Sequence, residues 1–77
     1  MHIEAKLIDH TRISVTFMDG DVVMHSHVIP TAKTAWTDVV ARWVEEEFPL
    51  VYWIGEWEYG ARNDSAPIAT RAFHIDE

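Results

Sequence analysis

Carboxylates are the side chains whose placement most strongly suggests chemistry in this chain. Glu45, Glu46 and Glu47 stand directly before Phe48 and Pro49, where the hydrophobic pattern predicts the end of a helix. The carboxyl end of a helix carries partial negative charge, so cations are favoured there and anions are not. Three successive anions at such a place indicate a surface that is kept acidic for a partner.

A second group of carboxylates lies on a predicted strand. Glu56 and Glu58 alternate along it and therefore share one face, and alternate strand residues are about 6.6 Å apart, comparable to successive phosphates along a nucleic-acid strand. The alternative is a solvated face that only keeps the protein soluble. We assign partner binding to these acids, to one more acid on the helix and to two aromatic residues that end the strand: Asp38, Glu45, Glu46, Glu47, Glu56, Glu58, Trp57 and Tyr59.

The histidines offer a weaker candidate site. His25 and His27 are two residues apart on a predicted strand and so point the same way, and with His10 or His74 as a third ligand they could hold a transition metal. The register expected below places Arg12 across from His27, and a neighbouring cation weakens metal binding. We therefore expect neither a metal nor another cofactor.

Catalytic patterns are missing from the sequence. Nucleophilic catalysis needs a serine, a histidine and an acid brought together, and Ser14, Ser26 and Ser65 stand on strands or in a loop without such partners. The three glycines are isolated, so no glycine-rich phosphate loop exists. We expect a protein that is not an enzyme.

Length and composition restrict the class of protein further. The 77 residues form one domain, 1–77, with a formal net charge of −7 and no cysteine. The acidic balance argues against direct binding to nucleic acid or to an anionic membrane and favours a basic protein partner. The longest apolar run, Leu50 to Ile54, is too short to span a membrane, and the first residues lack the apolar core of a signal peptide, so we expect a cytoplasmic protein.

The clearest local signal is a hairpin turn at Asp19-Gly20. With these two as the central residues, Phe17 pairs with Val22 and Val15 with Met24. This register predicts one buried face and one solvent-exposed face, the latter holding His25 and His27. An earlier strand holds Ile3, Ala5 and Leu7, and either a break at residues 9–11 separates it from the hairpin or the two form one long bent strand.

A helix is predicted after Pro30, capped by Thr31 or Thr34 and stopped by Pro49. Its apolar stripe contains Trp36, Val39, Val40, Trp43 and Val44. Glu47 projects near this stripe, so either the last turn overhangs the sheet or Glu47 has a basic partner.

Two more strands complete the chain. Leu50 to Tyr59 and Ile68 to Ile75 are predicted strands, joined as a hairpin by a loop over Gly60 to Pro67. The order strand, strand, strand, helix, strand, strand predicts an α+β domain, an antiparallel sheet of four to five strands with one helix packed on one face. Most of the four tryptophans should help to fill the core, with one or two left as exposed anchors.

In size, acidity, lack of cysteine and sheet-plus-helix plan, the chain resembles the small acidic inhibitor proteins that bacteriophages encode, anti-CRISPR proteins and host-polymerase inhibitors among them. The resemblance covers the whole chain and rests on no motif. It implies a stoichiometric inhibitor that mimics nucleic acid and blocks the nucleic-acid-binding surface of a basic partner. Two alternatives stay open: an immunity-type protein that neutralises a basic nuclease toxin, and a homo-oligomeric structural module, for example a homodimer.

Overall fold

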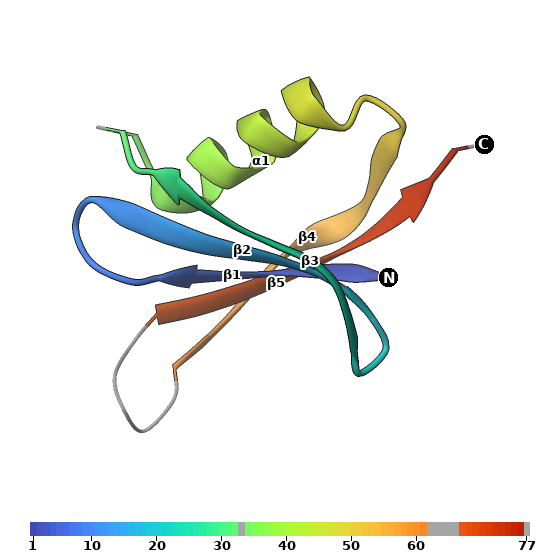
Figure 1. Ribbon diagram of the computed structural model, residues 1–77, viewed down its shortest axis with the longest axis horizontal. Coiled ribbons are helices and arrows are strands. Elements are labelled where there is room, and N and C mark those ends of the chain that lie inside the picture. The colour runs from blue at the N-terminus through green and yellow to red at the C-terminus, as the bar shows by residue number, and fades with distance from the viewer. Residues whose placement is uncertain (33, 62–66, 77) are drawn as a thin grey trace.

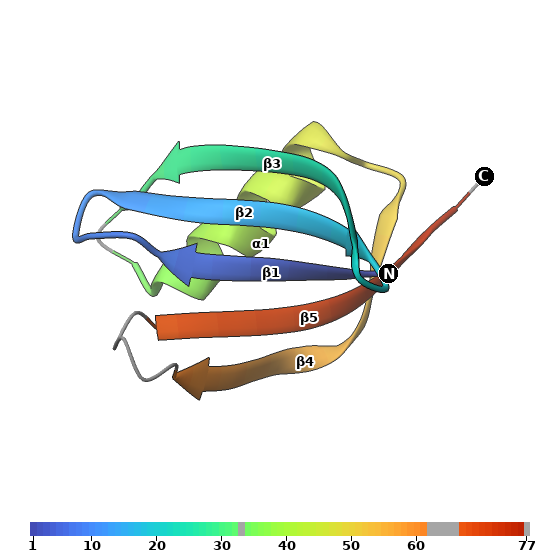
Figure 2. The same cartoon turned by 60° about the horizontal axis from the view of Figure 1, so that its bottom comes forward.

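The structure, a computed structural model, describes residues 1–32, 34–61 and 67–76. It contains five strands and one helix, in the predicted order: β1 (His2–Leu7), β2 (Arg12–Asp19), β3 (Val22–Pro30), α1 (Trp36–Glu47), β4 (Val51–Ala61) and β5 (Pro67–Ile75). The strands form one antiparallel sheet with the spatial order β3-β2-β1-β5-β4, which Figure 2 shows face on. The predicted α+β class, the element order and the β4–β5 hairpin are therefore confirmed.

The core lies between the sheet and helix α1, which crosses one face of the sheet (Figure 1). Val40 and Val44 of the helix are fully buried against alternate residues of the central strands, namely Ile3, Ala5, Ile13, Val15, Phe17 and Phe73. All four tryptophans pack against this cluster and are partly buried. The other face of the sheet carries no element among the described residues.

The register of the β2–β3 hairpin differs from the prediction. Asp19 pairs with Val22, so the two-residue turn is Gly20-Asp21, with Gly20 at a φ of 61°. Beyond the turn a bulge adds one residue to β3, so that Phe17 pairs with His25 rather than Val22. One extra residue moves every following side chain to the other face.

The buried residues of β3 differ from the predicted ones. Val22 and Met24, expected inside, are 65% and 41% exposed, whereas Ile29 is buried. Of the predicted core residues, Ile13, Val15, Phe17 and Val40 are buried, and Val39 and Trp43 are partly buried beside them.

Strand β4 also contains a bulge, but a larger one. Ile54 pairs with Ala72 and Glu58 with Thr70, so three residues of β4 face the single residue Arg71. Gly55 opens this bulge with a φ of 79°, a conformation that costs other residues energy. The two extra residues preserve the alternation, and Val51, Trp53 and Trp57 all pack against the core.

The ends of the helix need one correction. Its N-cap is Ala35 and no side chain caps it, so the expected capping by Thr31 or Thr34 is wrong. Thr31 lies too far ahead of the helix and donates instead to the carbonyl oxygen of His10 (2.9 Å).

The predicted loop at residues 60–67 is shorter than expected, because β4 includes Gly60 and β5 begins at Pro67; residues 62–66 lie outside the described part. Among the described residues, no helix has the length and apolar character needed to cross a membrane.

Candidate functional site

Four of the predicted acids lie on helix α1, and we refer to them together as the acidic helix surface: Asp38, Glu45, Glu46 and Glu47. All four residues are exposed, and the last turn of α1 contains no basic residue. Within residues 1–32, 34–61 and 67–76, no ion pair joins any of the four to a basic side chain. These carboxylates are therefore available to a partner.

Phe48 anchors the end of the helix that carries three of these acids. Its N–H donates to the carbonyl oxygen of Val44 (2.8 Å), and its ring lies 4.9 Å from that of Phe17 and 5.6 Å from that of Trp43. Because aromatic packing fixes this end, the three glutamates face solvent without being needed to close the helix.

Glu56 and Glu58 belong to a different part of the molecule. Together with His2 and Thr70 they line a hollow of about 410 Å³. His2 and Thr70 alternate along their strands with the core residues Ile3 and Ala69, so this hollow lies on the sheet face that points away from the helix. The predicted acidic residues thus form two separate groups rather than one continuous surface.

Arg71 shapes the β4 bulge from the core side. Its Nε donates to the carbonyl oxygen of Gly55 (2.8 Å), and its Cζ lies 4.6 Å from the ring centroid of Trp53 and 5.9 Å from that of Trp57. Its guanidinium also reaches a carboxylate oxygen of Glu56 at 4.0 Å. The cation stacks on both rings, an arrangement that favours arginine.

Trp57 is therefore partly buried and differs from the exposed anchor that the sequence suggested. Its indole N–H and that of Trp53 are buried and have no hydrogen-bond partner among the described residues. Tyr59 is the exposed aromatic residue of the pair, at 67%.

Tyr59 is fixed at the beginning of the helix. Its hydroxyl lies 3.0 Å from Oγ1 of Thr37, which is only 4% exposed. Glu45 to Glu47 stand eight or more residues further along α1, which corresponds to about 12 Å of helix axis. The aromatic residue and the glutamates are thus at opposite ends of the helix.

The two histidines pack on aromatic rings. The ring of Phe17 lies 6.3 Å from His25 and 6.1 Å from His27, and Trp43 lies 5.2 Å from His27. The expected pairing of Arg12 with His27 is wrong, because the bulge places Arg12 opposite Pro30. Among the described residues, no group of three or more potential ligands is arranged to hold a metal ion.

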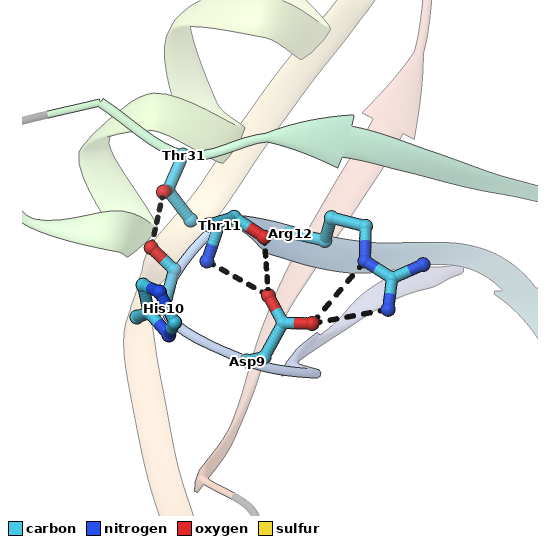
Figure 3. A network of polar contacts seen from close by, with 5 residues as sticks. All are labelled: Asp9, His10, Thr11, Arg12 and Thr31. Atoms are coloured by element: carbon cyan, nitrogen blue, oxygen red, sulfur yellow. Dashed lines mark hydrogen bonds and ion pairs between the residues drawn. The ribbon is translucent and has the colours of Figure 1, made fainter.

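Arg12 takes part instead in a local network at the β1–β2 turn (Figure 3). Asp9 accepts hydrogen bonds from the N–H and hydroxyl of Thr11 (2.8 and 2.6 Å) and from the guanidinium of Arg12 (3.0 and 3.2 Å). The bonds from Thr11 chiefly, then those from Arg12, hold the pKa of the Asp9 carboxyl well below its usual range. The network stabilises the turn and leaves no charge free for a partner.

Comparison of the chain with protein-family models, with curated proteins and with solved structures finds no match. The arrangement of residues therefore carries the functional argument alone. Sequence reasoning gave no role to Gly55 or Arg71, although a glycine inside a strand pattern is a recognised sign of a bulge.

Proposed function

We propose that this protein is a non-enzymatic acidic binding protein that inhibits a basic, nucleic-acid-handling partner by covering its basic surface. The acidic helix surface carries the proposal. Its four carboxylates are exposed and have no basic partner among the described residues. Three of them, Glu45 to Glu47, stand at the end of the helix where negative charge is unfavourable, which favours a role other than local stability.

The acidic residues and the exposed aromatic residue would contribute differently to such a complex. Exposed charges act mainly on the association rate and on its salt dependence, whereas aromatic anchors dominate affinity. The helix acids would therefore raise the rate at which the partner associates. Tyr59, which is exposed at the other end of α1, would be the aromatic anchor that contributes most of the affinity. Glu56 and Glu58 would meet a second part of the partner on the far sheet face.

Competition with nucleic acid tests this function. The protein is used to capture partners from a cell lysate at low salt, with the double variant Glu45→Lys, Glu46→Lys beside it. The matched control is Asp21→Lys, Asp76→Lys, which changes the net charge equally at exposed positions outside α1.

We expect wild type and control to capture a basic protein that is released by salt and by added double-stranded DNA or RNA. The helix variant should capture much less of it. Equal capture by the helix variant, or a captured protein that nucleic acid does not displace, would contradict the proposal. If the captured protein is a nuclease encoded beside this gene, the immunity-type alternative is the correct one.

A second candidate function, a homo-oligomeric module, has one observation in its favour. The edge strands β3 and β4 carry exposed apolar side chains, including Val23, Val28, Tyr52 and Ile54, each more than half exposed. Exposed apolar edge strands can pair with a second copy. A solution mass equal to one chain over a wide range of concentrations would exclude this candidate.

A further inference from the structure

A groove of about 430 Å³ lies between helix α1 and the end of strand β3. Its apolar lining comes from Ile29, which is buried, and from Val39 and Trp43, which are partly buried. Two carboxylates and one cation of the exposed helix flank also line it: Asp38, Arg42 and Glu46. The groove thus joins an apolar floor to part of the acidic helix surface.

The charged residues stand four apart in sequence and so follow one another along one flank of the helix. Asp38 and Glu46 are separated by about 12 Å of helix axis, since each residue rises about 1.5 Å. In an extended peptide, two residues four positions apart are separated by about 13 Å, and the residue midway between them points the same way. The two carboxylates therefore match two cations of an extended segment, with an intervening side chain above the apolar floor.

We propose that this groove binds an extended segment of the basic partner in which an apolar side chain stands midway between two lysines or arginines four residues apart. The inference rests on the proposed function and identifies what the acidic helix surface recognises. The apolar side chain would pack on Val39 and Trp43, and the flanking cations would meet Asp38 and Glu46.

A second copy of this chain does not fit the groove in this way. No two of its lysines and arginines stand four residues apart, and each copy carries a formal net charge of −7. The occupant is therefore a different, basic protein. Arg42 lies between the two carboxylates and competes with the incoming cations for them.

Arg42 allows a test in which the direction of the change in peptide affinity is predicted in advance. The probe is the capped heptapeptide GKSLSKG, titrated at low salt into the 15N-labelled full chain and followed by NMR. We expect saturable shifts of the Ile29 and Val39 amides and of the Trp43 indole. Replacing the leucine of the peptide by serine should weaken binding at least about threefold, since apolar burial is lost. Glu46→Gln should weaken binding and Arg42→Gln should tighten it, each about twofold or more, since each removes one exposed charge at the groove.

A control variant and a second ligand separate the inference from the proposed function. The control variant Asp21→Asn should leave peptide binding unchanged, and poly-L-lysine reports any general affinity for basic chains. If poly-L-lysine binds but the peptide shifts other residues, or binds equally well without its leucine, the groove is not the site and the proposed function stands. If neither the heptapeptide nor poly-L-lysine binds at low salt, both the inference and the proposed function fail. A concentration-dependent dimer with shifts at Val39 and Trp43 would assign the groove to a second copy and overturn the inference.

Discussion

Replacing Glu45 and Glu46 with lysine should stabilise the fold while it weakens partner binding. Both residues are exposed in the last turn of α1, where no basic residue balances the helix dipole. An unfavourable charge at a helix end costs about 0.3–1 kcal/mol, and a favourable one contributes a similar amount. Two reversals therefore amount to roughly 1–4 kcal/mol before any correction.

One local interaction reduces this gain. Arg42 is four residues before Glu46 and can pair with it, so a lysine there exchanges a weak attraction for a weak repulsion. This exchange costs about 0.4–1 kcal/mol. A net stabilisation of about 1 kcal/mol remains, which for a domain of this size raises Tm by about 4–8 °C.

Thermal unfolding followed by circular dichroism measures the change, at low and at high salt. The difference between variant and wild type should shrink at high salt, because the charges are exposed. The control Asp21→Lys, Asp76→Lys shows how much of the effect comes from lower net charge alone. A lysine variant that is less stable than wild type and still binds its partner would refute the reasoning, since the glutamates would then be structural.

Four further predictions test the fold and the remaining sites. Val40→Asp should destabilise the fold by several kcal/mol, since Val40 is fully buried and an unpaired buried charge is costly. The control Val22→Asp should be nearly neutral, because Val22 is 65% exposed. Equal melting temperatures for the two variants would contradict the helix placement. Gly55→Ala should cost about 1 kcal/mol or more because of the φ of 79°, while Gly60→Ala serves as its unstrained control in the same denaturant series. Asp9→Asn should lower stability at neutral pH; since the folded pKa of Asp9 is depressed, the difference should be constant above about pH 4 and diminish as the pH falls further, and a difference that grows in acid would contradict this. Zinc or nickel should leave Tm unchanged in wild type and in His25→Ala alike, because no group of three ligands exists among the described residues, and a metal-dependent rise lost in the variant would contradict this.

The two bulges show how far the sequence pattern predicts the faces of a strand. In β4 the bulge adds two residues, so the alternation along the strand survives and Trp53 and Trp57 both pack against the core. In β3 the bulge adds one residue, so Met24 is exposed rather than buried, and His25 and His27 lie on the face of the sheet that carries Phe17. A two-residue period cannot detect a single insertion, because both registers place apolar residues on each face of β3.

The candidate site was predictable only where it depends on a single element. The exposure of Asp38 and Glu45 follows from the helical period alone. The α1–β3 groove needs the distance between two elements, which no local pattern contains. The role of Arg71 could not be predicted for the same reason, since the indole rings that it contacts belong to the neighbouring strand.

The aromatic cluster at the end of α1 explains why this protein can keep anions there. Phe48 closes the last turn with its own N–H and packs on Phe17, which is itself buried in the core. Helix ends that lack such packing depend more on caps and favourable charges. Since tertiary packing fixes this helix end, the energetic penalty of three glutamates is tolerable, and their positions are free to serve recognition. The same packing places Trp43 beside Phe48 and at the groove, so a residue that stabilises the helix end also forms part of the floor against which we propose the partner binds.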